Sequence, residues 1–93
     1  MRRLKLDISL IFDVVVNNRN ERLIKTLGAT IRELRIERHL SQAQLAVLSE
    51  MMPSQVGRIE RGEINPSVST TYALAVALRV DMNTLIKVEF PNP

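Results

Sequence analysis

The sequence predicts a mainly α-helical domain of five helices, with a short β-strand near the N-terminus. From residue 21 onward, apolar side chains recur at steps of three and four residues, and helix-capping residues and helix stops separate these runs. Apolar residues make up 45% of the chain, yet only 3% of all residues are aromatic, which suits closely packed helices better than a β-sandwich. A chain of 93 residues is long enough for one hydrophobic core.

Residues 1–20 are predicted to form an N-terminal extension. Every even position from Leu4 to Val16 is apolar, which is the period of a half-buried strand. Such a strand needs a partner for its edge, either residues 87–90 or its own copy across a two-fold axis. A helix is the alternative, because four apolar residues also have helical spacing: Leu4, Ile8, Ile11 and Val15.

The first helix is expected from about Glu21 to about Arg38. Ser41 is a good N-cap for the second helix. The buried face predicted for this second helix consists of Leu45, Ala46 and Leu48.

The third helix begins with Pro53 in its first turn and ends before Gly62. Residues 65–67 form a turn and cap for the fourth helix, and Asp81 caps a short fifth helix. The fourth helix carries Val68, Tyr72, Leu74, Ala75, Ala77 and Leu78, and the fifth carries Leu85 and Ile86. Tyr72 is expected in the core with its hydroxyl at the surface.

Composition excludes several kinds of functional site. With no cysteine and one histidine, the chain lacks the ligands for a thiolate or histidine metal cluster. One histidine and three glycines also supply neither a catalytic triad nor a phosphate-binding glycine loop, so we expect no enzymatic activity, metal or cofactor. The apolar run near the N-terminus is too short to span about 30 Å of hydrocarbon, so we expect a soluble protein. The absence of cysteine fits a reducing cytoplasm, which is the compartment we expect.

The net charge of +3 fits a polyanionic partner without requiring one. Residues 28–93 carry seven basic and seven acidic side chains, so the surplus lies in the first 27 residues. Any attraction for phosphate in the helical region must therefore come from local placement of charges.

The third helix has an outer face suited to DNA. Val56 and Ile59 would face the core, which leaves a polar set outward: Ser54, Gln55, Arg58 and Arg61. The major groove of B-DNA is about 12 Å wide and admits one α-helix. There, Arg58 can pair with guanine and Gln55 with adenine, because each two-pronged side chain matches two base-edge atoms.

Residues 41–67 closely resemble the helix-turn-helix of the phage repressor and Cro-like family, often called the XRE family. Their sequence is SQAQLAVLSEMMPSQVGRIERGEINPS. The matching framework consists of Ser41, Gln42, Leu45, Ala46, Val56, Arg58 to Gly62 and Asn65 to Ser67, preceded by Ile31 to Arg35 and followed by Leu85. The resemblance covers about residues 27–90. It implies a five-helix, lambda-repressor-like bundle over residues 21–90, with residues 91–93 as a tail.

The resemblance also implies roles for individual residues. Gln42 stands where the family holds a backbone phosphate, and Arg61, Asn65 and Ser67 stand where relatives touch phosphate. The base-reading positions are those of Pro53, Ser54, Gln55 and Arg58. Arg35 and Glu60 match a structural ion pair that ties the first helix to the end of the third.

Three departures from the family pattern affect the recognition helix. Glu50 replaces the glycine common in the turn, so the turn either avoids positive φ or carries strain. Met52 replaces the usual polar cap, and Pro53 removes a backbone donor. Gly57 costs helix stability and leaves bare a position where relatives often place a contacting side chain.

The function implied is that of a sequence-specific DNA-binding transcriptional regulator of the repressor type. We expect a homodimer on a near-palindromic operator, because two-fold operators need a second recognition helix about 34 Å away along the duplex. The alternative is an antitoxin-like or assembly module that keeps the helix-turn-helix as a scaffold. In that case residues 1–16 would bind a partner protein.

Overall fold

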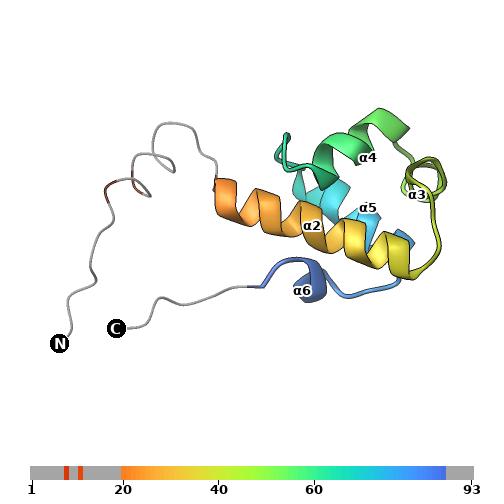
Figure 1. Ribbon diagram of the computed structural model, residues 1–93. Coiled ribbons are helices and arrows are strands. Elements are labelled where there is room, and N and C mark those ends of the chain that lie inside the picture. Colours follow the sequence, from red (N-terminus) through yellow and green to blue (C-terminus); the bar gives the residue numbers. More distant parts are fainter. Residues whose placement is uncertain (1–7, 9–10, 12–19, 88–93) are drawn as a thin grey trace.

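The computed structural model describes Ile8, Ile11 and residues 20–87. Within residues 20–87 the chain forms five helices: α2 (Glu21–Glu37), α3 (Gln42–Leu48), α4 (Pro53–Glu60), α5 (Val68–Leu78) and α6 (Met82–Leu85). The long α2 runs across the domain, with α3 and α4 on one side and α6 on the other (Figure 1). The described part contains no strand, and the predicted mainly helical fold is confirmed.

Local sequence signals set the helix starts. Ser41 and Gln44 form a reciprocal capping box at α3, since each side chain bonds to the backbone N-H of the other at 3.0 and 2.8 Å. At α4, Pro53 occupies the first turn, and the N-cap residue Met52 makes no side-chain cap bond. Asp81 stands at the N-cap of α6, but its side chain makes no cap bond either, so the expected side-chain cap is wrong there.

Within residues 20–87, four residues at helix ends adopt left-handed backbone conformations. They are His39, Glu50, Gly62 and Arg79, with φ values of 56°, 56°, 70° and 58°. Only Gly62 is a glycine, so three of these ends place a side chain in a conformation that costs about 1 kcal/mol. The ends of α2 and α4 agree with the predicted bounds.

The core lies between all five helices. It consists of Leu27, Ile31, Leu45, Ala46, Val56, Ile59, Leu74, Ala75, Leu78 and Leu85. Two predicted members are missing: Leu48 is 55% exposed and Tyr72 is 61% exposed. Ser49 is buried at the end of α3, where its hydroxyl donates to the carbonyl of Leu45 at 2.5 Å. On α5 the buried face is Thr71, Leu74, Ala75 and Leu78, which leaves Tyr72 on the outer side.

A glycine lets the backbones of α2 and α4 approach each other closely. A Cβ atom at Gly28 would lie 2.3 Å from the carbonyl oxygen of Ile59 and 2.8 Å from that of Glu60. Both atoms belong to rigid backbone, so this part of α2 accepts no side chain without a shift of α4. Helix α4 is thus seated directly on the backbone of α2.

The predicted N-terminal strand lies mostly outside the described residues. Ile8 and Ile11, the two described there, are helical rather than extended, so the strand prediction is not met at these positions. They are three residues apart, which is part of the spacing of the helical alternative. The suggested pairing with residues 87–90 also lies outside the described part, apart from Lys87, which belongs to no strand.

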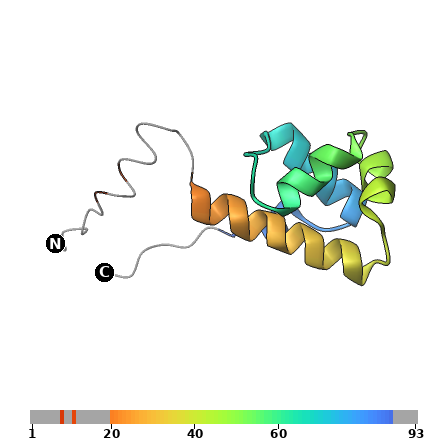
Figure 2. The same ribbon diagram turned by 45° about the horizontal axis from the view of Figure 1, so that its top comes forward.

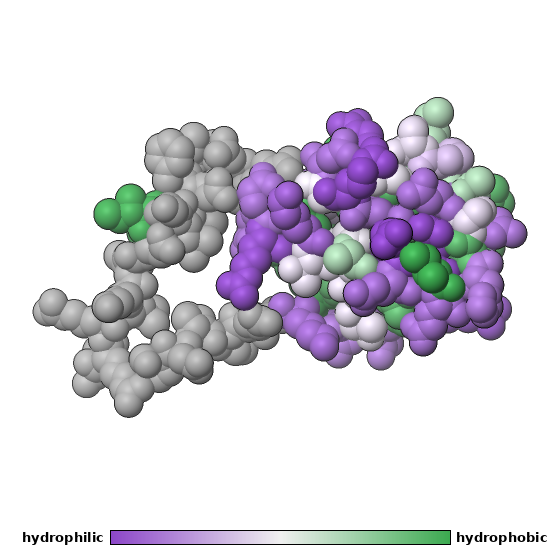
Figure 3. All heavy atoms as spheres, viewed as in Figure 1, coloured by the Kyte–Doolittle hydropathy of each residue, from purple (hydrophilic) through white to green (hydrophobic). Residues whose placement is uncertain are grey.

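The outer surface of the helical domain is largely polar on the side of α2. Figure 3 shows hydrophilic side chains over most of this face. Among the described residues, no helix is long and apolar enough to cross a membrane.

Candidate nucleic-acid interface

The turn between α3 and α4 holds the two short helices at a fixed angle. Met51 N donates to the carbonyl of Ala46 at 2.9 Å, and Glu50 N donates to that of Val47 at 3.3 Å. These bonds close the C-terminus of α3 around Glu50, whose φ is 56°. Of the two alternatives for this turn, the structure has the strained one, with a non-glycine residue at positive φ.

The face of α4 that points away from the core is accessible. Val56 and Ile59 are fully buried, whereas Pro53, Ser54 and Arg58 are exposed. Figure 2 shows α4 at the surface of the domain. This arrangement leaves the outer face of a short helix free to enter a groove.

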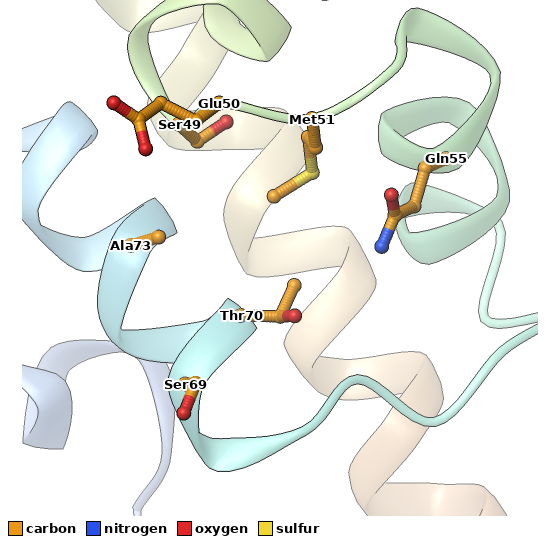
Figure 4. A pocket seen from close by; sticks show the side chains of 7 residues that line it. All are labelled: Ser49, Glu50, Met51, Gln55, Ser69, Thr70 and Ala73. Carbon is orange, nitrogen blue, oxygen red and sulfur yellow. The ribbon is translucent and has the colours of Figure 1, made fainter.

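Gln55 lies at the edge of this face and is half-buried. It lines a shallow, open pocket of about 230 Å³ between the α3–α4 turn and the first half of α5. The other lining residues are Ser49, Glu50, Met51, Ser69, Thr70 and Ala73. In Figure 4 the amide of Gln55 points toward Thr70 on α5. The side chain predicted to read adenine therefore faces this pocket in the free protein.

Arg35 and Glu60 form a bidentate ion pair between α2 and the end of α4. Arg35 Nε and Nη2 donate to the two carboxylate oxygens of Glu60 at 2.6 and 3.1 Å. Arg35 Nη1 also donates to the carbonyl of Leu40 at 2.8 Å, so the guanidinium ties α2, the following loop and α4 together. The side chains of Arg35 and Glu60 are only 12% and 1% exposed.

Gln42 joins this ion pair, which was not anticipated from the sequence. Its Nε2 donates to Glu60 Oε1 at 3.1 Å, and the side chain is half-buried. The carboxylate of Glu60 thus accepts hydrogen bonds from both Arg35 and Gln42. No local pattern signals this contact, because the two partners are 18 residues apart along the chain.

Arg61 is exposed and pairs with Glu63, a residue that the sequence reasoning did not single out. Its Nε donates to a carboxylate oxygen of Glu63. This hydrogen bond, together with the nearby positive charges of Arg61 and Arg58, lowers the pKa of the Glu63 carboxyl below its ordinary value. The sequence feature that could have indicated this ion pair is the presence of opposite charges two residues apart, just after the end of α4.

Asn65 and Ser67 lie in the loop between α4 and α5, and both are exposed. Ser67 caps α5: its hydroxyl accepts from Thr70 N at 3.1 Å and donates to Thr70 Oγ1 at 3.0 Å. Ser67 therefore lies just after the helix-turn-helix, and its hydroxyl is already hydrogen-bonded to Thr70.

Gly57 does not sit on the outer face, although the sequence suggested a bare contact position there. It is buried, and a Cβ at this residue would lie 3.0 Å from Arg61 Nη1 and 3.4 Å from Gln42 Oε1. The space above Gly57 is therefore occupied by two side chains of the same protein. In the described part of the chain, no group of three or more His, Cys, Asp or Glu residues could hold a metal ion.

The chain matches known proteins over this same region. Residues 26–85 match the family model described as a helix-turn-helix domain. The chain is 39% identical over 61 residues to an immunity repressor protein of Bacillus phage phi105, covering 66% of this chain and 42% of that protein. It is 35% identical over 66 residues to the HTH-type transcriptional regulator SutR of Escherichia coli K12, covering 71% of this chain and 37% of SutR. The chain thus spans less than half the length of these two relatives.

The fold is also similar to that of a solved regulator. The restriction-modification controller protein C.AhdI from Aeromonas hydrophila superposes with a TM-score of 0.67 and 40% sequence identity, covering 72% of this chain and all of that one. The predicted family is confirmed by these comparisons. With its short α3 and α4 joined at Glu50, this chain belongs to the helix-turn-helix domain family of the phage repressor and Cro-like type.

Proposed function

We propose that this protein is a sequence-specific DNA-binding transcriptional regulator of the repressor type, with α4 as the helix that enters the major groove. One observation carries the proposal: α4 exposes its outer face while Gly28 and the Arg35–Glu60 pair fix its backbone on α2. A helix held in this way presents its side chains to a groove in one orientation. The relatives named as an immunity repressor and a transcriptional regulator support this function.

The side chains of this surface divide into two proposed roles. Base edges are read by four residues of α4: Pro53, Ser54, Gln55 and Arg58. Backbone phosphates are bound by Gln42, Arg61, Asn65 and Ser67. Gln55 leaves its pocket to reach a base, so part of the surface rearranges on binding. Phosphate contacts make the affinity fall steeply with salt.

The test is selection of binding sites from a pool of random DNA duplexes. We expect enrichment of a short, near-palindromic sequence and loss of that enrichment in Arg58→Ala. Arg79→Ala is the matched control, because it removes the same charge. Arg79 follows the C-terminus of α5, whereas the pocket that Gln55 lines lies against the first half of α5. Failure of the wild-type protein to enrich any sequence refutes the proposal, as does equal enrichment by Arg58→Ala.

We further propose that the protein acts in the cytoplasm as a homodimer. Three apolar residues at helical spacing remain exposed on α5, namely Val68, Tyr72 and Val76. A helix that is apolar on both its core-facing side and its outer side usually has the outer side covered by another protein surface. A second copy of this chain would cover that side of α5. Sedimentation equilibrium of the full chain, and of a variant lacking residues 1–16, tests the dimer and the part that the N-terminal extension plays in it.

A protein-interaction module is the second candidate. It is supported by exposed apolar side chains in the N-terminal extension, where Ile8 is 82% exposed. In this case residues 1–16 bind a partner protein and the helix-turn-helix serves as a scaffold. Removal of these residues would then release a co-purifying protein and leave DNA binding intact, whereas loss of both dimer and DNA affinity supports the regulator.

A further inference from the structure

The middle of α4 carries no side chain on the side that faces Gln42 and Arg61. At Gly57 a Cβ would lie 3.0 Å from Arg61 Nη1, 3.4 Å from Gln42 Oε1 and 3.6 Å from Gln42 Nε2. The Arg61 guanidinium and the Gln42 amide thus both lie next to the backbone of Gly57. Gly57 otherwise weakens α4, because glycine is unfavourable in a helix interior.

Hydrogen bonds to neighbouring carboxylates hold both side chains in place. Gln42 Nε2 donates one hydrogen to Glu60, which is itself fixed by Arg35. Its second Nε2 hydrogen is not used by that bond. Arg61 Nε donates to Glu63, which directs Nη1 back across Gly57. The result is a cationic guanidinium next to an amide at the edge of α4. The Oε1 atom of this amide lies nearer to Gly57, and its Nε2 keeps one hydrogen beyond the bond to Glu60.

We propose that Gly57 is a positioning residue: by lacking a side chain, it allows the Arg61 guanidinium and the Gln42 amide to form one donor cluster that binds a single DNA backbone phosphate. This inference rests on the proposed function and adds Gly57 to its phosphate-binding surface. An arginine supplies charge and several donors, and an adjacent amide adds a donor in a fixed direction, which together suit a phosphate oxygen pair. A methyl group at residue 57 would push the guanidinium away from the amide.

The fold accepts this change, because the closest atom is the free end of a flexible side chain. Gly57→Ala should therefore raise the melting temperature, since alanine is favoured over glycine within a helix. The same substitution should weaken DNA binding. Stability and affinity then move in opposite directions, which a purely structural role for Gly57 does not produce.

The experiment is a double-mutant cycle on the selected DNA site, using the full chain. Wild type, Gly57→Ala, Arg61→Gln and the double variant are titrated at several salt concentrations, and their thermal unfolding is followed by circular dichroism. We expect Gly57→Ala to bind about tenfold more weakly at low salt. The slope of log K against log salt should fall by about 0.9 for each phosphate that the variant no longer binds. Because both substitutions disable the same cluster, the double variant should bind no more weakly than Arg61→Gln.

Two outcomes overturn the inference while leaving the regulator intact. One is that Gly57→Ala binds the selected site as tightly as wild type, with an unchanged salt slope. The other is that its effect persists in full in the Arg61→Gln background, which means that Gly57 acts independently of Arg61. If wild type selects no DNA sequence, the proposed function fails and this inference fails with it.

Discussion

Replacement of Gly28 by alanine tests whether the first helix seats the recognition helix through backbone contact. The new Cβ would lie 2.3 Å from the carbonyl oxygen of Ile59 and 3.0 Å from the carbonyl carbon of Glu60. Neither atom can move without its whole helix. α4 must therefore shift away from α2, which also disturbs the bidentate contact between Arg35 and Glu60.

Two opposing terms set the size of the effect. Overpacking a well-packed contact costs about 1 to 3 kcal/mol, and a clash with backbone belongs at the upper end of that range. Replacing glycine by alanine within a helix returns about 1 kcal/mol. The net loss for Gly28→Ala is about 2 kcal/mol, which corresponds to a fall of about 10 °C in melting temperature for a domain of this size.

Thermal and urea unfolding measure the stability, and titration of the selected duplex measures the DNA affinity. Ala29→Gly is a matched control, because it is the reverse substitution at the neighbouring, exposed position of α2. It should lower stability by about 1 kcal/mol through helix propensity and leave DNA affinity unchanged. If Gly28→Ala is as stable as wild type and binds DNA equally well, α4 is not seated on the α2 backbone as described.

Four variants probe the ion pairs and the turn. Arg35→Ala should lower the free energy of unfolding by about 3 to 5 kcal/mol, because it leaves the Glu60 carboxylate buried without its cation. The paired change of Arg35→Met with Glu60→Leu should come much closer to wild type, and urea melts compare the two. Glu50→Gly should raise stability by about 1 kcal/mol, because it relieves a positive φ; no gain in melting temperature would mean that the turn is unstrained. The Glu63 carboxyl should titrate below its ordinary pKa of 4.5 and return toward that value in Arg61→Gln, as measured by NMR. Because this pKa is lowered, the ion pair is present at neutral pH and is lost as the pH falls through the lowered pKa.

The helix bounds could be predicted because their signals are local. The capping residue Ser41, the first-turn Pro53 and the helix stop at Gly62 each act within about four residues of their own position. The fold class could be predicted from the three- and four-residue spacing of apolar side chains, which is also a local signal. The departure at Glu50 was also visible in the sequence, although only the structure shows that its backbone is left-handed.

Contacts between distant elements could not be predicted in this way. The approach of α2 to α4 at Gly28 depends on how the two helices cross, and a glycine in a helix has no periodic signature of its own. The same holds for Gln42, whose amide reaches Glu60 from another helix. The expected burial of Leu48 and Tyr72 was wrong, because apolar character alone does not give the rotation of a short helix against the core.

The backbone contact between α2 and α4 at Gly28 has a consequence for DNA shape. Side chains at an interface can change rotamer and absorb a poor fit, but two backbones in direct contact have no such freedom. In the complex proposed above, α4 would therefore meet DNA at a fixed angle, and the duplex would supply any adjustment of bend or twist. We expect base pairs that no side chain touches to influence affinity through their flexibility, because easily deformed steps lower the energy of that adjustment.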